Sequence, residues 1–411
     1  MKILKIFLLF VICYLLFAIC CYSQDFSLVE SVPVETSLEQ STLPRASDVW
    51  LEMLNGATET IDIETFYIAN EKGEVLEKIL KAIKDAASRG VRVRIMIDES
   101  FYNNNYEKSA DELNNIPNIT IRKIPYKKIA GGVMHAKYFV VDKKDLFIGS
   151  QNMDWRALKH IHEMGARIKS KKLAKAFLNI FEIDWALCEN QSDENIAKLK
   201  KKYSKNLINS RKPIKIKTEE FGDIILYPAF SPAGFLPDKY NKEETELLKI
   251  IKNTKHRLCI QIFSYSLKGE GKDEVYDKID KALRDAASRG VKIKIIFSNW
   301  AIKKGATESI QSLSTVPNIE IKFSNIPEYS GGFIPYSRVD HCKYFISDST
   351  LSWLSTSNWE RSYFYECRNA TLIIQNEEIN SLLEEAFLRS WNSTFTEPVD
   401  VNKTYTPIKR K

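Results

Sequence analysis

One short motif occurs twice in this chain. Residues 135–142 read HAKYFVVD and residues 341–348 read HCKYFISD, so a histidine, a lysine and an aspartate recur at the same spacing. The residues that follow each copy also match: Gly149-Ser150 and then Asn152 in the first, Ser355-Thr356 and then Asn358 in the second. Two copies with matching tails are not expected by chance, so the fold must contain an internal repeat.

The repeat extends well beyond the motif. Residues 81–95 read KAIKDAASRGVRVRI and residues 281–295 read KALRDAASRGVKIKI, an offset of 200 residues. Gly131-Gly132 and Gly331-Gly332 keep this offset, whereas His341 follows His135 at 206 because residues 333–340 form a longer approach. The pattern indicates duplication of a unit of about 180 residues, much longer than a solenoid repeat.

Hydrophobic periodicity gives the elements of each unit. Residues 46–55 and 74–89 predict helices, the second ending before Gly90, and residues 60–68, 91–97 and 118–124 predict strands. Alternating helices and strands favour a largely parallel sheet in each half. The predicted divisions are an extended lead-in over 24–45 within a first half of 24–197, a basic linker of 198–217, a second half of 218–400 and a basic tail of 401–411.

The first 23 residues predict targeting to the secretory pathway. Lys2 and Lys5 precede an apolar run from Ile6 to Tyr22, which suits either a signal peptide cleaved near Ser23 or a retained N-terminal membrane anchor. Glycosylation sequons lie at Asn118, Asn190, Asn369, Asn392 and Asn402. Four cysteines follow the leader, and their spacing leaves disulfides and free buried thiols equally open: Cys188, Cys259, Cys342 and Cys367.

The paired motifs suit phosphodiester chemistry. On a strand, His135 and Lys137 share one face. Two histidines facing each other across a pseudo-twofold axis can divide the work: one attacks phosphorus to form a phosphohistidine, and the other protonates the leaving oxygen and later deprotonates water. The side chains expected to hold the non-bridging oxygens are Lys137, Lys343, Asn152 and Asn358. The chain has no Cys/His spacing typical of a zinc site, and we expect neither a metal nor a cofactor.

The twin motifs resemble those of the phospholipase D superfamily. LVESVP at 28–33, GSQNMDWRAL at 149–158 and TSNW at 356–359 are similar to its endolysosomal phospholipase D3/D4-like branch and poxvirus relatives, over nearly the whole chain after the leader. The resemblance implies an α/β fold of two pseudo-symmetric βαβ sandwich halves with one active site at their interface. It also implies a location outside the cell or in the endolysosomal lumen. Ser355 departs from the glycine found at Gly149.

The resemblance also assigns roles. It implies catalytic His135 and His341, with His135 the nucleophile and His341 the acid, beside the lysines Lys137 and Lys343. It adds Ser150 and Thr356 to the phosphate-binding asparagines, and it makes Glu163 and Glu366 the residues that orient the opposite histidine. Asp142 and Asp348 complete the catalytic motif, and we expect them to fix the turn and strand rather than touch substrate.

The substrate is less determined than the reaction. The superfamily's name and much of its membership favour a phospholipid, with phosphatidylcholine cleaved to phosphatidate and choline. The alternative is a luminal 5′ exonuclease on single-stranded DNA or RNA, and a second alternative is a catalytically silent phosphate- or lipid-binding scaffold. The net charge of +7 is compatible with any phosphate-bearing ligand. The expected partner is therefore a phospholipid membrane surface or single-stranded nucleic acid, with no obligate protein partner.

Overall fold

The computed structural model describes residues 25–102, 107–189, 192–205, 207–237, 240–271, 274–408 and 410. The predicted leader and the sequon at Asn190 lie outside these ranges. Within them, no helix has the length and apolar character needed to cross a membrane.

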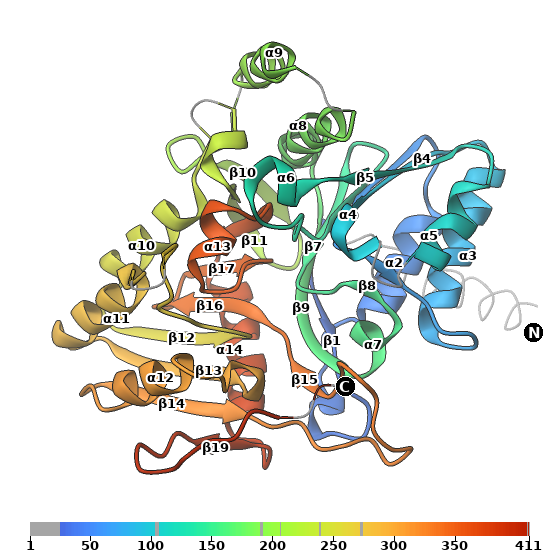
Figure 1. Cartoon of the computed structure of the whole chain (residues 1–411). Coiled ribbons are helices and arrows are strands. Elements are labelled where there is room, and N and C mark those ends of the chain that lie inside the picture. Colours follow the sequence, from blue (N-terminus) through green and yellow to red (C-terminus); the bar gives the residue numbers. More distant parts are fainter. Residues whose placement is uncertain are drawn as a thin grey trace, which may run out of the picture.

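The repeat in the sequence is a repeat in the fold, because two sheets have the same strand order (Figure 1). The first sheet runs β1 (Phe26–Ser31), β9 (Ile161–Lys169), β7 (Asp145–Gly149), β6 (Tyr138–Val141), β2 (Thr60–Glu64), β4 (Arg92–Asp98), β5 (Ile119–Ile124). The second runs β11 (Gly222–Ser231), β18 (Asn369–Gln375), β17 (Leu351–Ser355), β16 (Lys343–Ser347), β12 (Arg257–Ile262), β13 (Lys292–Ser298), β14 (Ile319–Ser324). The edges of the second sheet add β10 (Ile214–Thr218) and β19 (Thr396–Pro398), and a separate pair joins β3 (Ile68–Ala69) to β8 (Met153–Asp154). The predicted two-half α/β fold is confirmed.

Helices cover the sheets. In the first half, α2 (Ala46–Asn55) and α3 (Val75–Ser88) form where they were predicted, and Gly90 follows α3 with a left-handed φ of +91°. The corresponding helices of the second half are α10 (Glu243–Asn253) and α11 (Lys278–Ser288). The longer remaining helices are α5 (Glu107–Asn114), α8 (Lys171–Leu187), α9 (Asp193–Tyr203), α12 (Ala306–Ser314) and α14 (Glu377–Trp391). Short helical segments are η1 (Ser37–Gln40), α4 (Glu99–Phe101), α6 (Tyr126–Ala130), α7 (Trp155–Lys159), η3 (Ala233–Phe235), η4 (Asn299–Ala301) and α13 (Arg361–Tyr365).

Two sequence-based predictions, the largely parallel sheets and the linker, are wrong. The sheets are mixed: β2-β4-β5 and β12-β13-β14 pair in parallel, as does β15 (Val339–Asp340) with β9, and the other neighbours within the two sheets are antiparallel. The motif strands continue into tight turns, and a tight turn reverses the chain into an antiparallel neighbour such as β7. The lead-in contains β1, which pairs with β9 along its whole length. The predicted linker holds the end of α9 and most of β10, so it belongs to the second sheet.

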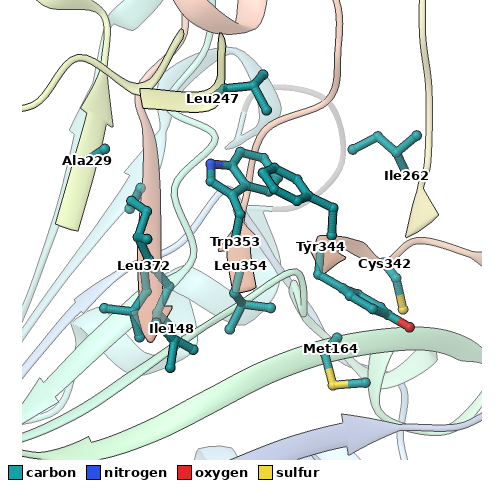
Figure 2. Packing of buried hydrophobic residues seen from close by; sticks show 14 of the residues in the cluster. Ile148, Met164, Ala229, Leu247, Ile262, Cys342, Tyr344, Trp353, Leu354 and Leu372 are labelled. Carbon is teal, nitrogen blue, oxygen red and sulfur yellow. The ribbon is translucent and has the colours of Figure 1, made fainter. Parts of the chain in front are cut away.

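The inner faces of the two sheets share one hydrophobic core. Ile148 and Met164 from the first half lie in the same buried cluster as Tyr344, Leu354 and Leu372 from the second, and Figure 2 shows them side by side. A strand from the second half, β15 (Val339–Asp340), even pairs with β9 of the first sheet. The strands that carry the two motifs therefore face each other. The four cysteines left open by the sequence are all free thiols.

Candidate active site

Each motif histidine is fixed by the backbone of the other half. The His135 N–H donates to the carbonyl of Arg368 at 2.9 Å, and the His341 N–H donates to the carbonyl of His162 at 2.8 Å. His135 is only 4% exposed. The positive charges of Lys343, Lys137 and His135 lie close enough to His341 to lower the pKa of its imidazole. The two predicted catalytic histidines therefore converge on one site between the halves.

Glu163 orients His341 across the interface between the halves, as predicted. It lies on β9 and is fully buried, and its two carboxylate oxygens are 2.8 and 2.9 Å from Nδ1 of His341. Burial raises the pKa of Glu163, whereas burial and the nearby lysines lower the pKa of His341. The Nδ1 proton of His341 is therefore held between the imidazole and the carboxylate.

The prediction for Glu366 is wrong, because Asn369 occupies the corresponding position on His135. The Nδ1 of His135 lies 3.0 Å from Oδ1 of Asn369, whereas Glu366 pairs with Arg361 at 2.6 Å. The spacing contained the signal: Glu163 follows Asn152 by the same eleven residues that separate Asn369 from Asn358.

The Asn369 amide has a fixed orientation. Its Nδ2 donates to the carbonyl of Tyr363 at 2.8 Å and to Oγ of Ser231 at 3.2 Å. Its Oδ1 therefore faces His135 and accepts from it, so the imidazole carries its proton on Nδ1 and presents a lone pair on Nε2. Asn369 is also fully buried, so its sequon is excluded from glycosylation, whereas the sequons at Asn118, Asn392 and Asn402 are exposed.

Two buried lysines, Lys137 and Lys343, add positive charge to the site. The Nζ of Lys137 donates to the His135 carbonyl at 2.7 Å, and the Nζ of Lys343 donates to the His341 carbonyl at 2.6 Å. Burial lowers the pKa of both lysines, that of Lys343 to about 7. Burial and the lysine charges likewise lower the pKa of His135. A site with four buried basic groups favours an anion, since an anion would stabilise their protonated forms.

The predicted phosphate-binding residues fall into two groups. The Oδ1 atoms of Asn152 and Asn358 are buried and have no hydrogen-bond partner in the described part of the chain, so the protein leaves part of the hydrogen-bonding capacity of both amides unused. Ser150 exchanges hydrogen bonds with the Met164 backbone at 3.1 and 3.3 Å, and Thr356 donates to Asn369 at 3.0 Å. We therefore assign these two hydroxyls to positioning rather than to phosphate binding.

The motif aspartates hold backbone at the far end of the motif strands. Asp142 accepts N–H groups from Thr58, Glu59 and Thr60 at 2.7–3.1 Å. Asp348 does the same with residues 255–257 at 2.8–3.1 Å. These hydrogen bonds lower the pKa of both carboxyl groups. Both aspartates therefore act as structural residues, as expected.

Three buried residues of types that can bind a metal ion lie together beside His341: His162, Asp340 and Cys342. The Nε2 of His162 is 2.8 Å from Oε1 of Glu30, and its Nδ1 is 3.2 Å from Nε2 of Gln261. Both ring nitrogens are thus engaged by the protein. The group serves as a hydrogen-bonded support for the backbone that carries Glu163 and His341.

Comparison with known proteins agrees with this geometry. A family model described as "Cardiolipin synthase, PLD-like domain", where PLD is phospholipase D, matches residues 50–185 and 247–391. The chain is 29% identical to the virion nicking-joining enzyme of Vaccinia virus (strain Western Reserve), covering 90% of this chain and 88% of the relative. It is 29% identical to the 5′-3′ exonuclease PLD3 of Rattus norvegicus, covering 91% and 80%.

A solved structure shares the fold. Phosphatidylserine synthase of Haemophilus influenzae superposes with a TM-score of 0.60 at 12% identity, covering 91% of this chain and 87% of that one. The duplicated site and the family match across both halves lead to one assignment: the chain belongs to the phospholipase D-like family of phosphodiesterases.

Proposed function

We propose that the protein cleaves phosphodiester bonds of single-stranded nucleic acid through a phosphohistidine intermediate. The observation that carries the reaction is the convergence of two buried His-Lys pairs, each fixed by the opposite half of the chain. The substrate class is supported by the curated relatives, whose names describe an exonuclease and a nicking-joining enzyme.

His135 is the nucleophile in this proposal. Asn369 keeps the His135 proton on Nδ1, so the lone pair of Nε2 is available to attack phosphorus. The N–P bond forms while the bond from phosphorus to the leaving oxygen breaks, and the leaving oxygen takes that electron pair. Because the partner of His135 is a neutral amide, it favours the protonated and inactive form of this imidazole less than a carboxylate would.

His341 is the acid and then the base. A carboxylate partner at Nδ1 supports a protonated imidazole, so Nε2 of His341 can donate its proton to the leaving oxygen. In the second step water attacks phosphorus, His341 accepts the water proton, and the N–P bond breaks with its electron pair returning to His135. The different partners, Glu163 and Asn369, thus divide the work between two otherwise equivalent histidines.

The two lysines and two asparagines stabilise the charge that builds up on phosphorus. Lys137 and Lys343 lie in a dry environment, where a cation acts more strongly on a phosphoryl oxygen than it does in water. Asn152 and Asn358 supply one amide group from each half of the chain.

Phospholipid hydrolysis, which the sequence favoured first, remains the competing candidate. The description of the matching family model, which names cardiolipin synthase, supports it. We rank nucleic acid first because the relatives that match about nine-tenths of the chain are named for nuclease and strand-joining activities.

The test is a direct comparison of two substrates with the purified protein at pH 5 and pH 7. One is a 5′-hydroxyl single-stranded oligonucleotide, and the other is phosphatidylcholine vesicles with a primary alcohol present. We expect stepwise shortening of the oligonucleotide and its loss, on the order of 10³-fold, in His135→Ala. Release of choline with formation of phosphatidylalcohol, and no oligonucleotide cleavage, would overturn the substrate assignment.

A further inference from the structure

A side pocket of about 190 Å³ opens next to the catalytic centre in the second half. Its walls come from η4, from the segment between β14 and β15, and from Ile408 and Arg410. A cavity of roughly 150 Å³ accepts a benzene ring, so this pocket is large enough for one planar ring. None of the residues assigned above to the reaction lines it.

One aromatic ring separates the pocket from His341. The Phe263 ring lies 4.7 Å from the His341 ring, with Nζ of Lys343 5.0 Å from its centroid. On its other side, Phe263 lies 5.6 Å from Trp300, which lines the pocket. A group in the pocket would therefore be attached close to a phosphate held by His341 and Lys343.

The lining combines aromatic rings with cationic donors. Trp300 and Tyr336 lie 6.2 Å apart with their planes inclined at 63°, and Phe333 is 42% exposed at the same pocket. The guanidinium of Arg410 lies 4.8 Å from the Trp300 ring and donates to the Trp300 carbonyl at 2.8 Å. This composition is typical of surfaces that bind unpaired bases.

One donor in the lining has no hydrogen-bond partner. Arg338 is 7% exposed; its Nε donates to Pro327 and its Nη1 to Val34, each at 2.6 Å. Its Nη2 has no hydrogen-bond partner among the described residues. This Nη2 atom is enclosed by protein, so Arg338 contributes the positive charge of its guanidinium to the pocket wall rather than a donor that a ligand reaches. The pocket thus combines a planar-ring environment with a cation in its wall.

The pocket is built by the part of the chain that breaks the internal symmetry. Its outer wall belongs to the longer segment that delays His341 to an offset of 206 residues. In the first half only residues 133–134 separate Gly131-Gly132 from His135, so that half has no counterpart of this wall. A centre with two equivalent His-Lys pairs does not by itself distinguish the two directions of a strand, whereas a pocket on one side does.

We propose that this pocket binds the base of a nucleotide that adjoins the scissile phosphate and thereby fixes the direction in which a strand enters. The inference rests on the proposed nucleic-acid function. The base lies among Trp300, Tyr336 and Phe333, beside the guanidinium of Arg338.

The test uses three oligonucleotides: an intact one, and two that each carry an abasic unit on one side of the scissile phosphate. In the unmodified enzyme, removing the base on one side only should raise KM about tenfold, the scale of one base stacked on an aromatic side chain. Trp300→Ala and Phe333→Ala should raise KM for the intact strand and abolish that difference between intact and abasic strands. Because the readout is a ratio within each variant, a general loss of activity cancels.

Tyr203→Ala is the matched control, since this half-buried aromatic residue ends α9, which Figure 1 places at the edge of the molecule. It should keep the unmodified ratio. Equal KM for all three strands, or a ratio unchanged in both pocket variants, overturns the pocket assignment while oligonucleotide cleavage still supports the proposed function. Failure of the unmodified enzyme to cleave any strand, with turnover of phosphatidylcholine, overturns both.

Discussion

At the residue scale, a single amide distinguishes the two histidines. Asn369→Asp should place a carboxylate 3.0 Å from Nδ1 of His135 and raise the pKa of that imidazole. The nucleophile would then be protonated at mildly acidic pH. We expect kcat/KM at pH 5 to fall by up to about tenfold, with a smaller loss at pH 7, as the acidic limb of the pH–rate profile moves up by about one unit.

The control for Asn369→Asp is Glu163→Gln, which removes the carboxylate from His341 instead. It should lower kcat at every pH and leave the acidic limb in place. An acidic limb that moves only in Glu163→Gln would reverse the assigned roles of the two histidines.

Lys343 gives the site a pH dependence. Its pKa, lowered to about 7 by burial, means that the free enzyme loses this cation as the pH rises through 7. We expect kcat/KM to fall above about pH 7, because the neutral amine binds phosphate poorly, while kcat falls less because bound phosphate restores the protonated form. A pH–rate series from 5 to 8.5 checks this, and a kcat/KM that keeps rising to pH 8.5 would contradict it.

The site residues show what sequence patterns can and cannot predict. His135, Lys137, His341 and Lys343 could be placed because the repeat supplied each of them twice. Asn369 was missed because the resemblance implied a carboxylate, and a neutral amide at the same spacing carries no charge pattern to draw attention. The pocket lining was missed for another reason: Trp300, Arg338 and Arg410 lie far apart in the chain and meet only in three dimensions.

At the scale of elements, the motif aspartates join a turn to a neighbouring strand. Asp142 follows β6 and accepts three consecutive N–H groups before and at the start of β2. Asp142→Ala should lower the free energy of unfolding by about 1–3 kcal/mol at pH 7, because these donors lose a charged acceptor. Specific activity per folded molecule should be retained, and a large loss of kcat in folded protein would instead make Asp142 catalytic.

The loss of stability in Asp142→Ala should become smaller as the pH falls. The pKa of Asp142 is lowered in the folded protein, whereas in the unfolded chain it is about 3.9. Its contribution is therefore present above about pH 4 and is lost as the pH falls through the folded value. The difference in urea midpoint between the variant and the parent should be smaller at pH 3 than at pH 7. Asp223→Ala, at an exposed ion pair, should change neither midpoint appreciably.

Helices were easier to predict than sheet order. α2 and α3 follow from local apolar spacing, whereas β1 joins the sheet through β9, more than 130 residues away. No local pattern in residues 24–45 specifies that partner. The mixture of parallel and antiparallel strand pairs could not be predicted either, because the sequence of a strand does not indicate the direction of its neighbour.

At the scale of the whole molecule, the two halves are not independent folding units. The guanidinium of Arg368 in the second half is fully buried and pairs with Asp184 on α8 of the first at 2.6 Å. The largest buried cluster crosses the same boundary, with Ile148 and Leu354 among its members. A half on its own would expose that surface and leave Arg368 or Asp184 as an unpaired buried charge.

Unfolding should therefore be a single transition, even though the chain is a duplication. Hydrogen exchange followed by mass spectrometry along a urea series should show β2 and β12 losing protection at the same midpoint. Asp184→Asn should lower that common midpoint, by about 3–5 kcal/mol in free energy, and still unfold both halves together, because it weakens the interface on which each depends. Lys198→Gln, on the exposed face of α9, serves as the control and should leave the midpoint unchanged. Two separate midpoints in the unmodified protein would mean that each half holds its own core and that only the active site requires both.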